Sequence, residues 1–379
     1  MPRSMERRAF LEAALAASLA TPGTPRAAFA AKARDAPWRR ARRLGPGVNL
    51  SLWRDPLAAP KGLAEGREAF AEAAALGFRH VRLPIDPYPA VAGMRHGPEA
   101  ARRLAERLAA DLAAAQAQGL AVILDMHPSD LFRERLLAVR GEPERFAAAW
   151  AVIARSLARS DPESLVLELL NEPGEALGPR WHRLQAGLIE AIRAEAPEHT
   201  ILVTGAGFST VADLRQLDPL PDGNLIYGFH CYTPMLFTHQ GADWAPPYGR
   251  IRGVPYPLRA ADVRAAEAAA PAADRPAIAA EARDGAGWDG AALEALLAEA
   301  GEWARRHAVP LVCTEFGVFR DGGVRPADRL RYLADMRAAL SRHVQGWTVW
   351  DYSGGFGVVR RDRHGLHADR ALLRALGLT

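Results

Sequence analysis

The chain alternates between short apolar runs and longer amphipathic stretches along most of its length. The apolar runs are rich in aliphatic and β-branched residues and are nearly continuous, which is typical of strands buried on both faces of a sheet. Eight such runs are present: Gly47–Leu52, Phe78–Ile85, Leu120–Met126, Ser164–Leu170, Thr200–Thr204, Leu225–Phe229, Pro310–Thr314 and Gly346–Trp350.

Between these runs, apolar residues recur at intervals of three and four, the spacing of one-sided helices that pack on a sheet. The predicted helices lie near 64–76, 98–118, 144–159, 181–195, 209–217, 289–307 and 326–343. Eight strands alternating with helices predict a single α/β domain over residues 45–379, a (β/α)8 TIM barrel whose site lies at the C-terminal strand ends.

The alternative is an open doubly wound sheet, which predicts a glycine-rich phosphate loop after the first strand. Trp53-Arg54-Asp55-Pro56 follows that strand instead. One long insertion, residues 231–288, separates the sixth and seventh strands. Long loops of a barrel usually carry function, so we expect this insertion to rim the site.

Residues 1–44 differ from the rest of the chain. Arg7-Arg8 is followed by Phe10-Leu11, an alanine-rich stretch and the small-x-small site Ala28-Phe29-Ala30. This arrangement is similar to a twin-arginine export signal, although Glu12 stands where that signal usually carries lysine. We therefore expect an export signal over 1–30, a basic linker over 31–44 and a periplasmic or secreted protein. The alternative is an alanine-rich helix that is never cleaved.

The net charge of +4 resides in this leader. Residues 1–43 contain ten basic and three acidic residues, a local charge of +7, so the remainder is at −3. A mildly acidic body argues against nucleic acid as a partner. No run of eighteen apolar residues is present, so we expect no membrane insertion, and we expect a monomer.

The two cysteines, Cys231 and Cys313, are predicted to be free thiols in the core. Side chains alternate along a strand, and Cys313 shares parity with Glu315 whereas Cys231 is offset by one from His230. This parity predicts sulfurs on opposite sides of the barrel wall, outside the geometry of a disulfide.

Two glutamates carry the candidate chemistry. Glu172 follows the fourth apolar run in Asn171-Glu172-Pro173, and Glu315 follows the seventh in Glu315-Phe316-Gly317. A carboxylate at the end of a hydrophobic strand is poorly solvated and is costly without a partner or a function. Either one alone could be a strand-end residue that faces water or pairs with arginine. Two together provide the pair of carboxyl groups that glycoside hydrolysis needs.

Other polar and aromatic residues stand at the ends of the remaining predicted strands, and they converge on the same face of the barrel. They are Arg82, His127, Asn171, His230, Tyr232 and Trp350. In this order the residues resemble those of the retaining (β/α)8 glycoside hydrolases of family 5, the cellulase-like family, over about residues 45–352. The resemblance implies that Glu172 is the acid/base, Glu315 the nucleophile, Asn171 the partner of the sugar 2-hydroxyl and Trp350 the floor of the cleaved sugar's subsite.

Physical reasoning agrees with these roles. Arg82 is always charged and would keep Glu315 ionised, while the Tyr232 hydroxyl would orient the same carboxylate. His127 and His230 flank the pocket and could contact the sugar or Glu172, although a strand-end histidine is often only structural. They lack a third ligand at usable spacing, so we expect no metal and no other cofactor. Aromatic residues that could stack on sugar rings are Trp53, Trp244, Phe237, Tyr248 and Tyr256.

These observations predict an endo-acting enzyme that cleaves a β-linked glucan such as a β-1,4-glucan by double displacement, with a polysaccharide or oligosaccharide as its substrate. The alternatives are a hydrolase or transglycosylase acting on a bacterial exopolysaccharide, a β-1,3-glucan or a β-mannan. A non-catalytic carbohydrate-binding barrel is a further alternative, but such a protein would lack one of the two glutamates.

Overall fold

The computed structural model describes residues 35–53, 66–282, 285–362 and 365–378. The expected export signal over 1–30 lies outside these residues. Within them, no helix is both long and apolar enough to span a bilayer.

Eight parallel strands close into a barrel in the order β1-β10-β9-β6-β5-β4-β3-β2. This arrangement confirms the predicted (β/α)8 fold. The strands are β1 (Pro46–Asn49), β2 (His80–Ile85), β3 (Ala121–Met126), β4 (Leu165–Glu168), β5 (Thr200–Thr204), β6 (Leu225–His230), β9 (Leu311–Phe316) and β10 (Gly346–Val349).

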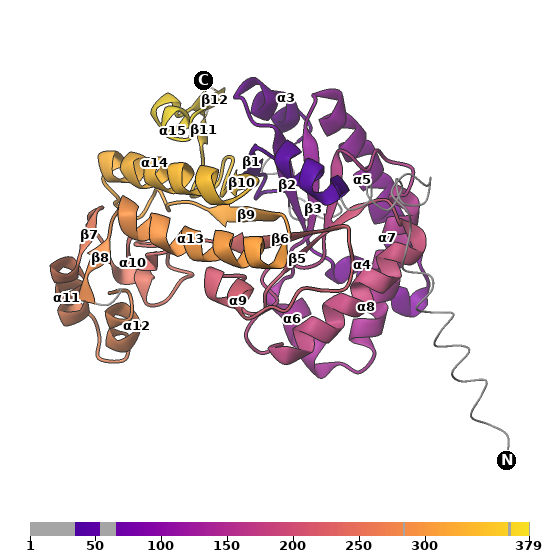
Figure 1. Cartoon of the computed structure of the whole chain (residues 1–379), viewed down its shortest axis with the longest axis horizontal. Helices are drawn as coiled ribbons and strands as arrows, with labels where there is room; N and C mark the ends of the chain where they lie inside the picture. Colours follow the sequence, from indigo (N-terminus) through magenta and orange to yellow (C-terminus); the bar gives the residue numbers. More distant parts are fainter. Residues whose placement is uncertain (1–34, 54–65, 283–284, 363–364, 379) are drawn as a thin grey trace, which may run out of the picture.

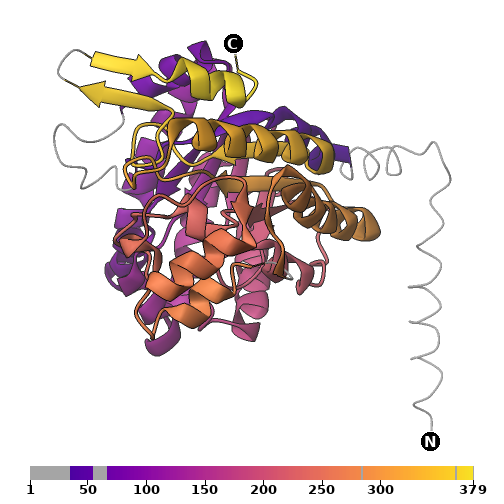
Figure 2. The same ribbon diagram turned by 90° about the vertical axis from the view of Figure 1, so that its left-hand side faces the viewer.

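Helices surround the strands, with α5, α7 and α8 on one side of the barrel and α13 and α14 on the other (Figure 1). The helices of the barrel are α3 (Glu68–Ala75), α4 (Tyr88–Gly93), η2 (Met94–His96), α5 (Glu99–Ala117), α6 (Asp130–Ala138), α7 (Glu142–Leu157), α8 (Pro179–Glu195), α9 (Val211–Arg215), α13 (Gly290–His307) and α14 (Pro326–His343). The chain ends with a hairpin of β11 (Val359–Asp362) and β12 (Gly365–Ala368), followed by α15 (Arg370–Ala375) outside α14 (Figure 2).

The insertion between β6 and β9 folds into small elements of its own. They are α10 (Met235–Thr238), η3 (Tyr248–Arg250), β7 (Leu258–Arg259), α11 (Ala260–Ala269), α12 (Arg275–Ala279) and β8 (Gly287–Trp288). The antiparallel pair β7–β8 and the two helices α11 and α12 form a lobe at the edge of the molecule (Figure 1). The part nearest β6 lies beside the barrel mouth, where Tyr232, His239 and Trp244 line a cleft.

A helix over residues 35–43 covers the N-terminal end of the barrel, within the segment 31–44 that the sequence suggested as a basic linker; residues 31–34 lie outside the described residues. Ala41 and Leu44 pack with the side chains that fill the lower barrel, such as Ile123 and Val312. Arg40 is buried and donates to Glu163 and to the Thr200 hydroxyl. The basic composition suggested a linker, but Arg39 and Arg40 of this helix are paired with Glu163.

The pairing of β6 with β9 contains a register shift that changes which side chains face inward. Phe229 lies opposite Cys313, whereas His230 lies opposite Glu315, so β9 has one extra residue at Thr314. Such a bulge breaks the strict alternation of side chains. Glu315 therefore turns toward the barrel mouth although Cys313, two residues earlier, faces the helices.

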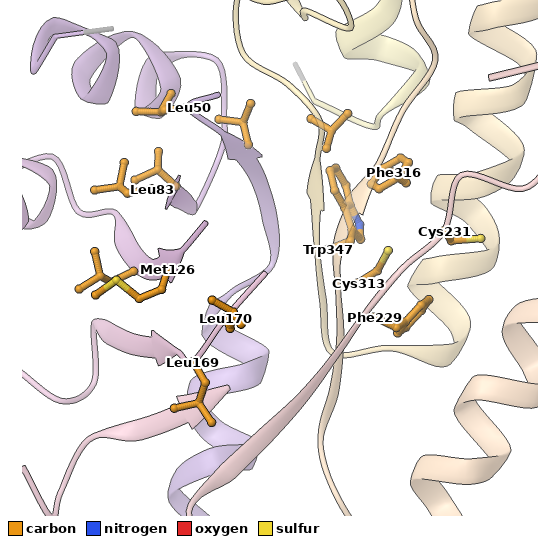
Figure 3. Packing of buried hydrophobic residues seen from close by; sticks show 14 of the residues in the cluster. Leu50, Leu83, Met126, Leu169, Leu170, Phe229, Cys231, Cys313, Phe316 and Trp347 are labelled. Carbon is orange, nitrogen blue, oxygen red and sulfur yellow. The ribbon is translucent and has the colours of Figure 1, made fainter. Parts of the chain in front are cut away.

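Both cysteines consequently lie on the same side of the barrel wall, and the predicted opposite orientation is wrong. Cys231 and Cys313 belong to the hydrophobic layer between strands and helices, together with Phe229, Phe316 and Trp347 (Figure 3). Both are free and buried. Burial raises the pKa of the Cys231 thiol to about 12.

Candidate active site

Glu172 lies four residues beyond the end of β4, on a turn with a backbone φ of 38°. A left-handed backbone is unfavourable for a residue with a Cβ and is usually kept where a side chain needs a particular direction. Neighbouring segments hold this turn: Arg133 on α6 donates to the Glu172 carbonyl at 3.0 Å, and Gly174 pairs with Gly207 after β5. The turn directs the Glu172 carboxyl group over the barrel mouth.

His230, at the end of β6, is the partner of this carboxyl group. Its Nδ1 lies 2.8 Å from Glu172 Oε1 and 3.7 Å from Glu315 Oε2. Burial opposes charge on both groups of the pair. The His230 hydrogen bond nevertheless lowers the pKa of Glu172, and the nearby charges of Glu315 and Glu172 raise the pKa of His230. One proton shared by the two groups therefore favours His230.

Glu315 lies within β9, and its side chain is almost fully buried. Arg82 Nη1 donates to its Oε1 at 2.6 Å, and the Tyr232 hydroxyl donates to its Oε2 at 2.9 Å. Burial and the adjacent carboxylate raise the pKa of Tyr232, which keeps its hydroxyl a donor. Both contacts favour an ionised and oriented Glu315.

Arg82 uses all five of its N–H groups inside the barrel mouth. Its partners besides Glu315 are two oxygens of Glu168 at 2.7 and 2.9 Å, Asn49 Oδ1 at 2.9 Å and Asn171 Oδ1 at 2.7 Å. Asp125 Oδ2 is 3.0 Å away, so three carboxylates surround one guanidinium. Burial raises the pKa of Glu168 and raises the pKa of Asp125 to about 7, despite the nearby Arg82 charge.

Sequence reasoning missed Asn49, Asp125 and Glu168. Each is a polar residue inside an apolar run and has the inward parity of its strand. Asp125 stands two residues before His127, and Glu168 stands in the middle of the run Ser164–Leu170. A search for carboxylates inside predicted strands could therefore have found two of the three.

His127 and Trp350 lie together beside the two glutamates. Their rings are stacked with centroids 5.7 Å apart and an angle of 20° between the planes. His127 Nδ1 is 2.9 Å from Asp125 Oδ2, and its Nε2 is 3.4 Å from Asn171 Nδ2. The structure thus brings together Arg82, His127, Asn171, Glu172, His230, Tyr232, Glu315 and Trp350 from the predicted set.

A cleft of about 610 Å³ opens above these residues. Its walls combine aromatic rings with carboxyl and amide groups, as a site for a sugar chain requires. The lining residues are Ser51, Leu52, His127, Asn171, Glu172, Tyr232, His239, Trp244, Glu315, Trp350, Asp351, Gly354, Gly355 and Phe356.

His239 and Asp351 are cleft residues that the sequence did not single out. His239, in the insertion, lies edge-to-face with Tyr232, and burial lowers its pKa to about 4. Asp351 follows Trp350 and accepts a hydrogen bond from Ser51, and burial raises its pKa to about 6. Neither residue belongs to a periodic pattern, because both lie in irregular segments.

Of the predicted stacking residues, Trp244 is the one placed at the cleft. Its side chain is 59% exposed and packs edge-to-face on Phe319 at 4.7 Å. Trp53 is 7% exposed, packs on Phe70 at 5.1 Å and does not line the cleft, so the expectation for Trp53 is wrong. The remaining candidates Phe237, Tyr248 and Tyr256 are buried within the insertion.

A second cavity, of about 660 Å³, lies in the insertion. Alanine, proline and isolated arginine and aspartate side chains line it, including Arg250, Arg252 and Asp274. Its carboxyl groups belong to Asp262 and Asp274, and none of its described lining residues is aromatic. The smaller cleft at the barrel mouth is therefore the candidate active site.

Among the described residues, Glu172, His230 and Glu315 form the one group whose ligand atoms could hold a metal ion, since these atoms lie within 4.8 Å of one another. The Arg82 guanidinium already compensates the charge of Glu315 and would repel a second cation. The absence of a metal from the reaction remains a prediction.

Comparisons with known proteins agree with this geometry. A family model described as "Cellulase (glycosyl hydrolase family 5)" matches residues 47–355. Endoglucanase C of Acetivibrio thermocellus is 27% identical over 306 residues, which cover 78% of this chain and 85% of that protein. Endoglucanase 3 of Fibrobacter succinogenes is 31% identical over 233 residues, 60% of this chain but 35% of that longer protein.

The solved structure of endoglucanase Cel5A from Thermotoga maritima superimposes with a TM-score of 0.74 and 26% identity. The superposition covers 90% of this chain and 99% of that one. The likeness in fold therefore extends over most of the chain.

Proposed function

Because the chain belongs to glycosyl hydrolase family 5, the cellulase family, we propose that it is an endo-acting enzyme that hydrolyses a β-linked glucan with retention of configuration. Glu315 is the nucleophile and Glu172 the acid/base in this proposal. The names of the related proteins, endoglucanases in each case quoted above, support a β-glucan as the substrate class.

The spacing of the two glutamates is the observation that carries the proposal. A carboxylate oxygen of Glu172 and one of Glu315 lie within 4.8 Å of each other. Retaining glycosidases hold their carboxyl groups about 5–5.5 Å apart, whereas inverting enzymes need about 6.5–9.5 Å to admit a water molecule. An oxygen–oxygen approach within 4.8 Å is compatible with the retaining spacing, and it supports direct attack by one carboxylate on the sugar.

The partners of each carboxyl group support the assignment of roles. Glu315 is buried, bound by Arg82 and Tyr232, and suited to attack as an anion. Glu172 is more accessible and shares a proton with His230, so this pair can protonate the leaving oxygen. Once Glu315 forms an ester, its negative charge disappears and the pKa of both Glu172 and His230 falls. The pair can then accept a proton from the incoming water.

The rest of the cleft supplies groups for binding a sugar chain. Trp350 is a flat surface for the sugar that is cleaved, and Asn171 can hydrogen-bond its 2-hydroxyl group, a contact that strengthens in the transition state. Trp244 extends the cleft at its rim. We further propose that the protein is exported, on the basis of residues 1–30, and acts as a monomer without a cofactor.

A product analysis tests this proposal. Purified enzyme would be incubated with cellopentaose, and the anomeric configuration of the new reducing ends followed by proton NMR. We expect the β-anomer first, followed by mutarotation; an initial α-anomer would show inversion and exclude Glu315 as nucleophile. Glu172→Gln and Glu315→Gln should each abolish turnover while the proteins remain folded.

A substrate panel then separates the alternatives. Reducing-sugar release from β-1,4-, β-1,3- and mixed-linkage glucans and from β-mannan identifies the linkage. Longer oligosaccharides among the products, in place of free reducing sugar, would indicate transglycosylation. If no reducing sugar is released from any of these substrates, the remaining alternative is a non-catalytic carbohydrate-binding barrel.

A further inference from the structure

Asp125 is a buried carboxylate that contacts two residues of the site without lining the cleft itself. It is fully buried, and its Oδ2 lies 2.9 Å from His127 Nδ1 and 3.0 Å from Arg82 Nη2. Its Oδ1 has no hydrogen-bond partner in the structure. Asp125 therefore makes its contacts through one oxygen, as a hydrogen bond with His127 and an ion pair with Arg82.

The amide of Asn171 determines what His127 must do on its other side. Arg82 can only donate, so the Asn171 atom 2.7 Å from its Nη2 is the oxygen, Oδ1. The amide nitrogen Nδ2 therefore faces His127 Nε2, at 3.4 Å. A nitrogen that faces an N–H donor must be an acceptor, so Nε2 carries no proton.

The proton of His127 is consequently on Nδ1, where Asp125 accepts it. A doubly protonated imidazole would place an N–H against the Asn171 amide hydrogens, and an Nε2-protonated one would leave Asp125 facing a lone pair. The hydrogen bond made at one ring nitrogen sets the tautomer that the other presents. The hydrogen bonds that link Arg82, Asn171, His127 and Asp125 therefore fit a His127 that carries its proton on Nδ1 and none on Nε2.

We propose that Asp125 is a positioning residue that holds His127 uncharged and protonated at Nδ1, and that through His127 it aligns the Asn171 amide and the Trp350 ring for the sugar. Asn171 Nδ2 has two hydrogens, of which one is directed to His127 and the second remains for a sugar hydroxyl. His127 also stacks on Trp350, so a change in the orientation of the His127 ring would also shift the Trp350 ring. The effect of Asp125 on catalysis rests on the proposed glycoside hydrolysis. The position of the His127 proton does not depend on that proposed function.

The protonation is measurable in the resting protein. Protein labelled with ¹⁵N-histidine would be examined by long-range proton–nitrogen correlation NMR, with His127→Gln used to assign the signal. We expect the wild-type His127 to show the Nδ1-protonated pattern at neutral pH, and Asp125→Ala to lose it. An Nε2-protonated or doubly protonated His127 in the wild-type protein would overturn the proposal.

Kinetics test the positioning role. In Asp125→Ala we expect kcat on cellopentaose to fall at least about tenfold while KM changes less than about twofold, because the contact with the 2-hydroxyl matters most in the transition state. Asp125→Asn keeps an oxygen acceptor for His127 and should recover part of kcat. Folded Asp125→Ala with wild-type kcat would overturn the proposal.

A matched control is available at the opposite end of the barrel. Asp222 pairs with Arg193 at 2.7 Å just before β6, and Asp222→Asn should lower the melting temperature but leave kcat unchanged. If Asp125→Ala does not fold, the kcat of Asp125→Asn and the His127 pattern in the wild-type NMR spectrum test the proposal instead. If the wild-type protein hydrolyses no β-glycan, the proposed function fails, and the NMR measurement decides the position of the His127 proton independently.

Discussion

Arg82 donates a hydrogen bond to Glu315 across 2.6 Å, and the same guanidinium binds Glu168 through two further N–H groups. The nucleophile candidate is thus tied to a buried carboxylate on the opposite side of Arg82. Together with Asp125, these groups bring three carboxylates to one cation. Arg82 therefore compensates the negative charge of Glu168 and Asp125, which are buried in the fold, as well as that of Glu315, the nucleophile candidate.

We predict that Arg82→Lys lowers kcat/KM at least about 100-fold, because lysine cannot reproduce five directed hydrogen bonds. It should also lower the free energy of unfolding by about 3 kcal/mol, since buried carboxylates lose their partner. Kinetics and urea unfolding measure both effects, with the exposed Arg67→Lys as control; near-normal turnover would remove Arg82 from the mechanism.

We predict that Trp244→Ala changes substrate binding and leaves stability nearly intact. Its exposed ring lies at the rim of the cleft, and an aromatic contact is worth about 0.5–1.5 kcal/mol, so KM for oligosaccharides should rise about threefold to tenfold. Trp288, buried in the same insertion, is the matched control: Trp288→Phe should lower the melting temperature and keep KM. A Trp244→Ala protein with a large loss of melting temperature and unaltered kinetics would make Trp244 structural.

We predict that Cys231 and Cys313 stay reduced in the folded protein. Both thiols are buried, and burial raises the pKa of each, so little reactive thiolate is present at neutral pH. Mass spectrometry after alkylation should find no modification of the native protein and two modified cysteines after denaturation. A Cys231–Cys313 bridge in protein isolated without reductant would contradict this prediction.

We predict that His80 destabilises the fold in acid. Burial lowers its pKa from 6.5 to about 3. Between these values the unfolded chain binds a proton that the folded chain does not, so the free energy of unfolding falls as pH decreases from 6.5 toward 3. The loss is as much as about 1.4 kcal/mol per pH unit.

Urea unfolding between pH 7 and pH 4 measures this slope. His80→Asn should be less stable at pH 7, because His80 fills the space beside Gly47 and bonds Thr348, but its stability should depend less on pH. The exposed His182→Asn should keep the wild-type slope. An unchanged slope in His80→Asn would assign the acid sensitivity to other groups.

The eight strands and the identity of the two glutamates could be read from the sequence because both depend on local patterns. A buried parallel strand needs a continuous apolar run, and a polar residue inside that run or just after it stands out, as Arg82, His127 and Glu172 do. The barrel then places all such strand ends on one face, so the composition of the site follows from the order of the runs.

Contacts between distant segments were decided by the tertiary structure. The extra residue at Thr314 reverses the direction expected for Cys313, and no pattern in the sequence marks it, because a bulge depends on the pairing of β9 with β6. Trp53 and Trp244 look equally suitable as sugar platforms in the sequence, yet one packs on Phe70 and the other lines the cleft. The sequence by itself determined the barrel and a part of the residues at its mouth. The other site residues, and the partners, orientation and protonation of all of them, depend on which side chains the closed barrel brings within hydrogen-bonding distance.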